Sequence, residues 1–227
     1  QLWLDATTGL YDATSGGSEV TTDGSSVARW EDQSGNGYHV TQGGVNSRPI
    51  LKTTIQNGLN VLRFDGSNDQ LFRSSPLYSG GDARTAFFVG KVTNNGLRAI
   101  WAAGSPTGAG LCWDVTPEVR VRVSGRQDFD QAFGTTDFRI LTIGMPENGL
   151  VGDIYGYLDG AEMNGTPTGV FSINTTNSTF SIGRGNQGSI TFTSGDFCEF
   201  LSYDSSLSTS DRETVEAYLA SKWGITL

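Results

Sequence analysis

Short segments in which apolar and polar residues alternate make up most of the chain from about residue 60 onward. The clearest is Val119-Arg120-Val121-Arg122-Val123, in which an extended strand has three valines on one side and two arginines on the other. Clusters of Gly, Asn, Asp and Ser bound these segments, and such clusters form turns. Strands with one buried face and one wetted face are typical of antiparallel sheets, so the pattern predicts an all-β chain.

The segments that we predict to be strands share this alternation and these boundaries. They are Leu59–Phe64, Thr85–Thr93, Arg98–Ala103, Gly110–Val115, Glu118–Ser124, Phe138–Met145, Asp153–Leu158, Thr179–Gly183 and Phe197–Tyr203. Two turn signals, Asp159-Gly160 and Asn94-Asn95-Gly96, predict tight hairpins, which join antiparallel strands. The stretch from Thr7 to Gly44 has few apolar residues and many turn residues, and we expect it to be mostly loop.

The end of the chain has a helical period. Its apolar residues recur at the spacing i, i+3, i+4 and i+8, and they are Val215, Tyr218, Leu219 and Trp223. Ser208 with Asp211, or Ser210 with Glu213, can cap the start of such a helix, and Gly224 can end it. The sequence therefore predicts one helix of about four turns that buries one side.

Composition limits the class of protein. The chain has 227 residues, of which 36% are hydrophobic and 17% charged, so it can bury a large core without help from a metal or disulfides. We expect one domain over residues 1–227. The net charge of −9 repels nucleic acid and anionic membranes, and no run of about 20 apolar residues predicts a membrane span. The start at Gln1, with no initiator Met, is expected of a processed secreted chain or an excised domain.

The two cysteines, Cys112 and Cys198, lie far apart in the sequence and have no C-x-x-C spacing. Each sits in an apolar run of the strand type, where cysteine behaves as a small buried hydrophobic residue. We therefore expect free thiols.

Several segments carry a family resemblance. They are Leu2-Trp3-Leu4-Asp5-Ala6, the W-x-D-x-S-G-x-G-x-H pattern within Val27–His39, Arg48-Pro49, Leu62–Leu71, Gly195–Asp204, Leu207-Ser208 and the closing Lys222-Trp223-Gly224. In this order they resemble the laminin-G-like branch of the concanavalin A-like lectin/glucanase superfamily, found in bacterial extracellular proteins and phage structural proteins. The resemblance implies an all-β, two-sheet antiparallel jelly-roll sandwich with one C-terminal α-helix. It leaves function open, because one fold hosts many functions.

Catalytic patterns of this superfamily are not found. Its glucanases carry E-x-D-x-x-E on one strand, and the nearest fragment here, Asp196-Phe197-Cys198-Glu199, places its two acids on opposite faces. The chain has one histidine, His39, which lies in a Gly-rich turn, and it has no G-x-S-x-G segment. We therefore expect no enzyme activity, and a polysaccharide hydrolase or lyase is the least favoured interpretation.

A bound Ca²⁺ is one interpretation of the acidic turns. Asp65, Asn68 and Asp69 offer several oxygen ligands within one turn, as hard cations require. The segment Asp32–Gly37 is a second source of such ligands, and Asp5 and Asp196 could complete a site. The alternative is that these Asx side chains hydrogen-bond to their own turns.

A carbohydrate site needs aromatic rings for sugar faces and planar polar groups for paired hydrogen bonds. The aromatic candidates are Trp101, Trp113, Phe129 and Phe133, although the alternation around Trp113 favours the core. Arg120, Arg122 and Arg126 form the most basic local patch on an acidic chain. The predicted site consists of these three arginines with Trp101, and the alternative is an ordinary solvated strand face.

These observations favour a non-catalytic extracellular recognition module, either glycan-binding or adhesive. A structural or decoration subunit of a virion, filament or surface layer is the alternative, and its partner would be a neighbouring surface or virion protein. Either function places the chain outside the cell, on a cell surface or on a virion surface.

Overall fold

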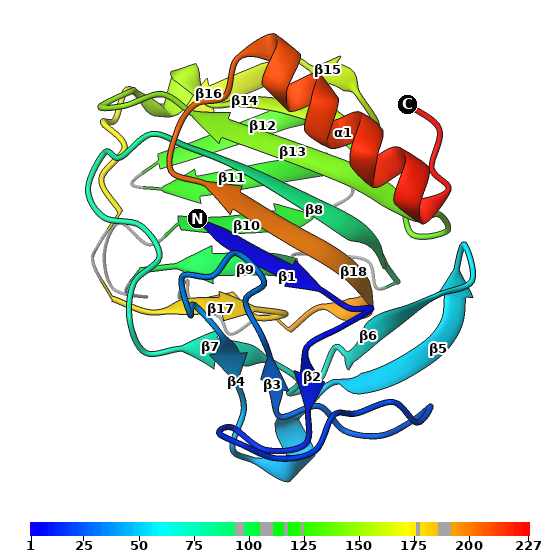
Figure 1. Cartoon of the computed structure of the whole chain (residues 1–227). Coiled ribbons are helices and arrows are strands. Elements are labelled where there is room, and N and C mark those ends of the chain that lie inside the picture. Colours follow the sequence, from blue (N-terminus) through cyan, green and yellow to red (C-terminus); the bar gives the residue numbers. More distant parts are fainter. Residues whose placement is uncertain (94–97, 105–110, 116–117, 124, 176–177, 186–191) are drawn as a thin grey trace.

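Two antiparallel sheets stack face to face, and one helix lies on the outer side of the first sheet (Figure 1). The structure is a computed structural model that describes residues 1–93, 98–104, 111–115, 118–123, 125–175, 178–185 and 192–227, with 111–115 described by their backbone alone. The architecture is the predicted antiparallel jelly-roll sandwich with a C-terminal helix. No helix in these ranges is long and apolar enough to cross a membrane.

The first sheet, sheet A, has eight strands in the described part of the chain. They are β1 (Leu2–Asp5), β5 (Ile50–Gln56), β6 (Leu59–Asp65), β8 (Arg84–Val92), β13 (Arg139–Met145), β14 (Tyr155–Leu158), β15 (Ala161–Met163) and β18 (Ser194–Tyr203). Their order is β15-β14-β13-β8-β18-β6-β5. On the side of β18 away from β8, its first half pairs with β6 and its second half with β1.

The second sheet, sheet B, has ten strands in the described ranges. They are β2 (Leu10–Tyr11), β3 (Arg29–Trp30), β4 (Val40–Thr41), β7 (Leu71–Arg73), β9 (Arg98–Ala103), β10 (Leu111–Val115), β11 (Glu118–Val123), β12 (Gly125–Ala132), β16 (Gly165–Thr168) and β17 (Phe180–Ile182). Their order is β16-β12-β11-β10-β9-β17-β7-β4-β3-β2. Two 3₁₀ turns, η1 (Val45–Ser47) and η2 (Val151–Asp153), lie in the connections.

All nine predicted strands are present, with boundaries that move by a few residues. The Asp159-Gly160 turn joins β14 to β15, and both residues have the positive φ of the predicted hairpin, +49° and +75°. The stretch before Gly44 has only strands of two residues after β1, in agreement with the loop prediction. Asn94-Asn95-Gly96 lies outside the described residues.

The central strands of sheet A are buried on both faces. Phe88 and Phe200 point into the core between the sheets, whereas Phe87, Val89 and Leu201 belong to a second cluster beneath the helix. Because both faces are covered, β8 is a nearly continuous apolar run and does not alternate.

Two glycines allow β8 and β18 to approach closely where the register of β18 shifts, between Phe197 and Glu199. A Cβ atom at Gly90 would lie 2.7 Å from the carbonyl oxygen of Asp196, and one at Gly195 would lie 2.1 Å from that of Lys91. A larger residue at either position would push the strands apart.

The helix α1 (Thr209–Trp223) begins and ends as predicted. Ser208 is the N-cap, and its hydroxyl accepts the Asp211 N–H and donates to the Asp211 carboxylate. Gly224 ends the helix in the left-handed conformation, with φ of +64°.

The buried side of α1 differs in part from the prediction. Leu219 and Trp223 are fully buried, but Tyr218 is 43% exposed. Arg212 and Glu216 are buried although they are charged, because they pair with each other and the Arg212 guanidinium stacks 3.7 Å over the ring of Tyr157.

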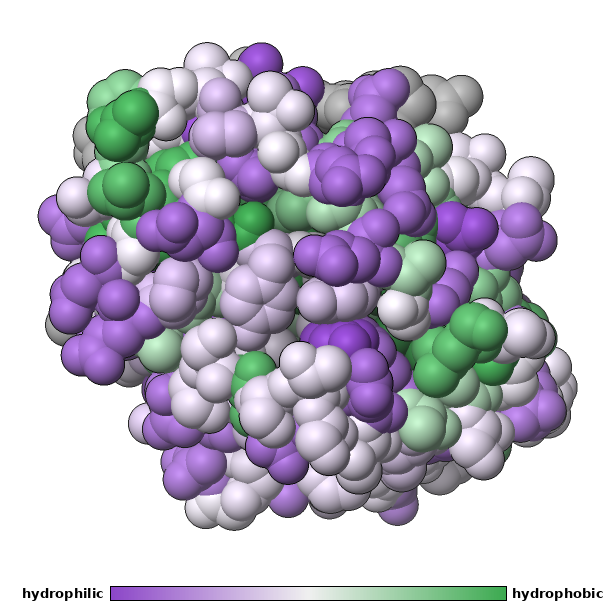
Figure 2. Space-filling view, turned by 90° about the horizontal axis from the view of Figure 1, so that it is seen from above, coloured by the Kyte–Doolittle hydropathy of each residue, from purple (hydrophilic) through white to green (hydrophobic). Residues whose placement is uncertain are grey.

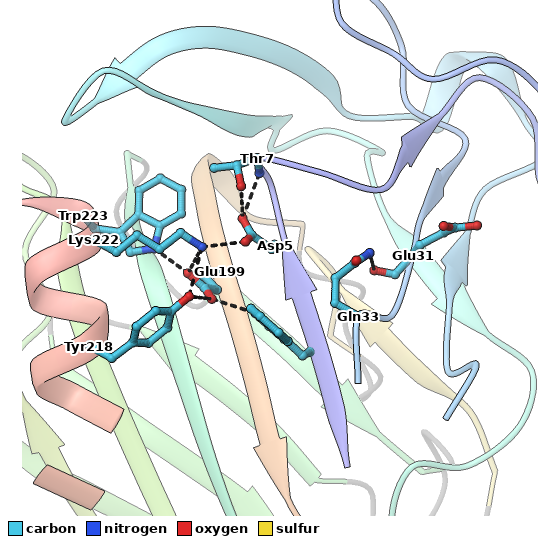
Figure 3. Close-up of polar contacts among 9 residues, drawn as sticks. Asp5, Thr7, Glu31, Gln33, Glu199, Tyr218, Lys222 and Trp223 are labelled. Carbon is cyan, nitrogen blue, oxygen red and sulfur yellow. Dashed lines mark hydrogen bonds and ion pairs between the residues drawn. The ribbon is translucent and has the colours of Figure 1, made fainter. Parts of the chain in front are cut away.

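A buried carboxylate connects the helix to the first strand (Figure 3). Glu199, on β18, is fully buried and accepts hydrogen bonds from Trp3 Nε1 at 2.7 Å and Trp223 Nε1 at 2.6 Å. Tyr218 Oη donates to it at 3.1 Å, and Lys222 Nζ lies 2.8 Å from Glu199 Oε2. These contacts join β1, β18 and α1.

Trp223→Ala should lower the free energy of unfolding by about 3–5 kcal/mol, because it leaves a cavity and removes one donor from a buried carboxylate. Tyr218→Phe, which removes one hydroxyl donor from the same carboxylate, should lower it by only about 1 kcal/mol. Urea unfolding followed by tryptophan fluorescence measures both values. A loss below about 1 kcal/mol for Trp223→Ala would mean that the helix is loosely docked.

Candidate functional site

The three predicted arginines lie together on the outer face of sheet B, on the neighbouring strands β11 and β12. Val119, Val121 and Val123 are fully buried, so Arg120 and Arg122 point away from the core, as predicted. The antiparallel register places Arg122 opposite Arg126 and Arg120 opposite Asp128. We call Arg120, Arg122 and Arg126 the guanidinium row.

Asp128 links two members of the row. Its Oδ1 pairs with Arg120 Nε, and its Oδ2 lies 2.8 Å from Arg126 Nε. The side chains are 19% exposed for Arg120, 43% for Arg126 and 26% for Asp128. The alternation predicts a wetted face for Arg120 and Arg122, and we expected both side chains to be largely exposed. They are half-buried instead, because Asp128 holds Arg120 against the sheet.

Trp101 cannot act as the predicted sugar platform. It is fully buried, and its ring packs against Tyr78, Phe180 and Phe200 with centroids 5.6–5.7 Å apart. Its side chain points inward from β9, because its neighbours across the core include Phe200 of sheet A. It contributes to the core and not to the outer surface.

The other aromatic candidates do not supply a platform in the described structure. Phe129 and Phe133 are 2% and 1% exposed and belong to the core. The side chain of Trp113 lies outside the described residues, as does that of Cys112. Cys198 is a free, buried cysteine, as predicted, and burial raises the pKa of its thiol.

An exposed aromatic ring that the sequence reasoning missed lies at the edge of sheet B, against Gly125, whose partner in register is the buried Val123. Phe171 is 46% exposed and follows β16, the strand that pairs with β12. Leu150 and Val170 nearby are 40% and 84% exposed. Figure 2 shows that hydrophobic surface on the face seen from above occurs as separate patches within mostly polar or neutral surface. The sequence signal was a Val-Phe pair inside a loop of Gly, Thr, Ser and Asn.

The turn predicted to bind Ca²⁺ is closed by its own hydrogen bonds. Asp65 Oδ1 accepts the backbone N–H groups of Ser67, Asn68 and Asp69 at 2.8, 3.2 and 3.3 Å. Asp69 Oδ2 accepts the N–H of Asp65 at 2.9 Å. This is the Asx-turn arrangement that was the alternative to a metal.

The two carboxylates of this turn have opposite pKa shifts. Burial, together with the charge of Asp65, raises the pKa of Asp69 to about 6. Burial also acts on Asp65, but the backbone N–H groups that it accepts outweigh burial and lower its pKa. In the described ranges no three or more His, Cys, Asp or Glu side chains group as a metal site, and calcium stays a prediction.

The second acidic segment also serves its own turn. The Asp32 carboxylate accepts the backbone N–H groups of Trp3, Ser34 and Tyr38 and the Ser34 hydroxyl, at 2.9–3.0 Å. His39 Nδ1 accepts the N–H of Asp32 at 3.0 Å. The W-x-D-x-S-G-x-G-x-H pattern thus builds a turn that its own aspartate and histidine hold together.

The remaining acidic candidates are occupied by cations of the chain itself. The Asp5 carboxylate lies 2.5 Å from Lys222 Nζ, and Asp196 forms a bidentate pair with Arg63 at 2.6 and 2.9 Å. Neither carboxylate contacts the Asp65 turn in any hydrogen bond or ion pair described for them.

The comparisons with known proteins identify the fold. Neither a family model nor a curated protein sequence matches the chain. The receptor-binding domain of botulinum neurotoxin D has a TM-score of 0.62 and 14% identity, and the match covers 100% of this chain and 55% of that chain. An arabinofuranosidase complexed with arabinofuranosyl-α-1,2-xylobiose has a TM-score of 0.59 and 13% identity, covering 87% of this chain and 51% of that chain.

A third similar structure is a separate domain. Domain 4 of AbnA, an extracellular arabinanase from Geobacillus stearothermophilus, was solved in complex with arabinotriose; it has a TM-score of 0.50 and 14% identity, covering 86% of this chain and 100% of that chain. The present chain spans about half the length of the first two chains. At these identities the similarity shows the antiparallel β-sandwich fold alone, and the laminin-G-like branch stays a prediction.

Stability should depend on pH through Asp69. The folded state holds the Asp69 proton more tightly than an unfolded chain, in which the pKa is about 4. The stabilisation of the folded state by protonated Asp69 is therefore fully present below about pH 4 and is lost as the pH rises through about 6. Asp69→Asn keeps an acceptor for the Asp65 N–H but does not titrate. The free energy of unfolding of the native chain should fall relative to Asp69→Asn between these pH values. Relative to Asp65→Asn, the free energy of unfolding of the native chain should instead rise with pH, because the pKa of Asp65 is lowered. If the native chain and both variants depend on pH in the same way, both pKa shifts are contradicted.

If Asp65, Asn68 and Asp69 bind Ca²⁺, the ion should raise the unfolding temperature. At a free Ca²⁺ concentration a hundredfold above Kd, binding stabilises the folded state by about 2.7 kcal/mol. The response should weaken below about pH 6, where the Asp69 proton competes with the ion, and Asp69→Ala should abolish it. Mg²⁺ should substitute poorly, because it requires a tight octahedral shell. Equal unfolding temperatures in EDTA and in Ca²⁺ would reject the metal and leave an Asx turn.

Proposed function

We propose that this chain is a non-catalytic, extracellular glycan-binding module whose ligand lies along the guanidinium row. The observation that carries the proposal is the placement of Arg120, Arg122 and Arg126 side by side on the outer face of sheet B, with Asp128 between two of them. Single arginines on a surface are common, but a row in which two members share one carboxylate is an ordered array of planar donors.

Such an array suits a saccharide. Each guanidinium presents up to five N–H donors in a rigid plane, which can form paired hydrogen bonds with neighbouring sugar oxygens. Asp128 adds two acceptor oxygens for sugar hydroxyls. Because Asp128 already holds Arg120 and Arg126 in place, less side-chain entropy is lost when a ligand binds.

The known structures with this fold support a binding function. One is named a receptor-binding domain, and another is an arabinanase domain bound to arabinotriose. A non-catalytic role is supported by the buried acids: Glu199 is hydrogen-bonded to two indoles, and Asp196 is paired with Arg63. The arabinanase with a similar domain is named as extracellular, which supports an extracellular location for this chain.

The alternative of a structural subunit joined through strand edges has less support. At the outer edge of β5, Gly24 N–H donates to Leu51 O at 2.8 Å, and Leu51 N–H donates to Ser25 O at 2.9 Å. The edge strand β16 of sheet B contains Pro167, which has no N–H to donate. Both features hinder pairing with a strand of another chain.

A glycan array should identify a bound saccharide, and the double variant Arg120→Ala/Arg122→Ala should weaken its binding by about tenfold or more, because two charged donors are lost. Arg139→Ala is the matched control, since Arg139 is also half-exposed and paired with an aspartate, but lies on sheet A. Calorimetry measures both affinities. If the control weakens binding as much as the double variant, or if no glycan binds, the proposal fails.

A further inference from the structure

One lysine lies between two buried carboxylates where the first strand, the last strand and the helix meet (Figure 3). Lys222 Nζ is 2.5 Å from Asp5 Oδ2 and 2.8 Å from Glu199 Oε2. Asp5 and Glu199 are partners in register on β1 and β18, where two like charges alone would repel each other. The cluster thus holds an amine against one carboxylate and places a second carboxylate beside both.

The two oxygens of the Asp5 carboxylate have different surroundings. Oδ1 accepts the backbone N–H of Thr7 at 2.9 Å and its hydroxyl at 2.7 Å, whereas Oδ2 faces Lys222. Two donors on one oxygen withdraw electrons from the carboxyl carbon, and they stabilise negative charge that develops on that oxygen when a nucleophile attacks. Thr7 therefore supplies the donors of an oxyanion hole for Asp5.

Glu199 is a fixed proton acceptor beside the lysine. The indole of Trp3 and the hydroxyl of Tyr218 donate to its Oε1, at 2.7 and 3.1 Å. The indole of Trp223 donates to Oε2 at 2.6 Å, and Oε2 is the oxygen that lies next to Lys222 Nζ. A carboxylate held within hydrogen-bond reach of a nucleophile has the position that a general base requires.

The amine is also held in place for attack. Gln56 Nε2 donates to the carbonyl oxygen of Trp223 at 2.7 Å, and Asn57 Nδ2 donates to that of Lys222 at 2.9 Å, so the hairpin between β5 and β6 fixes the end of the helix. The Lys222 side chain is only 17% exposed. Because the carboxyl carbon of Asp5 is one bond beyond Oδ2, Nζ lies close to the separation of about 3–3.5 Å from which a bond can form.

We propose that Lys222 and Asp5 join in an intramolecular amide bond, with Glu199 as the general base. One proton passes from Nζ to Oδ2 along their hydrogen bond, which leaves a neutral amine and a neutral acid. Nζ then attacks Cγ of Asp5, and the Thr7 donors stabilise the oxyanion on Oδ1. Glu199 takes a second proton from the nitrogen and passes it to Oδ2, which leaves as water. The third proton stays on the amide nitrogen.

The reaction removes two charges from a buried place. The positive charge of Lys222 and the negative charge of Asp5 disappear together, Glu199 ends as a carboxylate, and no oxidant or cofactor is consumed. Burial lowers the pKa of Lys222, but its hydrogen bonds to Asp5 and Glu199 outweigh burial and raise it. The amine is therefore not freed by loss of a proton to bulk water, and the proton has to move inside the cluster.

The bond would connect β1 to α1 across 217 positions of the sequence. Closing so long a loop restricts the unfolded chain and stabilises the folded state. The bond would also keep the first strand attached to the helix when the chain is pulled from its ends.

A second lysine–aspartate pair serves as the internal control. Lys52 Nζ is also 2.5 Å from an aspartate, Asp23, but these side chains are 22% and 48% exposed. The hydrogen bonds and ion pairs described for this pair include no further acid. Without a buried base, the same distance should give an ion pair and no amide.

Mass spectrometry of the native folded chain tests the proposal. The intact mass should be lower than the sequence mass by one water molecule. Trypsin should release a linked peptide that joins residues 1–29 to residues 213–227, because it cannot cleave after an acylated Lys222. Cyclisation of Gln1 removes ammonia and not water, so an accurate mass distinguishes the two reactions.

Three variants separate the amide from the ion pair. Lys222→Arg keeps the cation, but a guanidinium stays protonated and does not attack, so the chain should keep its full mass and give no linked peptide. Glu199→Gln keeps the shape of the side chain without a proton acceptor and should also keep the full mass. Lys52→Arg should lose water as the native chain does. Circular dichroism shows whether each variant is folded.

Several outcomes would overturn the inference. They are a native chain that keeps its full mass after prolonged incubation, a loss of water without the linked peptide, and a loss of water that persists in Lys222→Arg or in folded Glu199→Gln. If Glu199→Gln does not fold, the linked peptide of the native chain and its absence from Lys222→Arg decide the question. Glycan binding does not enter any of these measurements, so the proposed function is tested separately.

Discussion

The buried carboxylate of Glu199 is the interaction on which the arrangement of the molecule depends. A charge at full burial is strongly destabilising unless it is paired and hydrogen-bonded. Here two indole N–H groups, from Trp3 and Trp223, and the ammonium of Lys222 satisfy it. Burial alone would lower the pKa of Lys222, but its bonds to Asp5 and Glu199 outweigh burial and raise it. The helix and the first strand are therefore positioned by one side chain of β18.

The helix in turn determines which surface is available for a ligand. By covering Phe87, Val89 and Leu201, α1 makes much of the outer face of sheet A into a second core. The outer face of sheet B at β11 and β12 instead carries charged side chains over a layer of buried valines. A rigid sheet beneath the guanidinium row limits movement of the arginines, which favours selective binding.

The sequence predicted the fold better than the site, and the reason is physical. Alternation and turn residues are local, so β11 and the Asp159-Gly160 hairpin could be predicted from neighbouring residues. The strand β12 was missed because its exposed face is charged and its buried positions include a glutamine, Gln127. Trp101 was misjudged and Phe171 was missed because the exposure of a ring depends on which distant segment covers it. No local pattern places Phe171 on Gly125, 46 positions away in the printed sequence.

The connection between the two ends of the chain bears on how the protein folds. Trp3 and Glu199 are 196 positions apart, and Asp5 and Lys222 are 217 apart. During synthesis the first strand leaves the ribosome long before its partners exist, so it cannot be docked until β18 and α1 have been made. Contacts of such long sequence separation slow folding. A chain that stops before the helix would leave Trp3 and Asp5 without these partners, and its exposed apolar strands would be prone to aggregate.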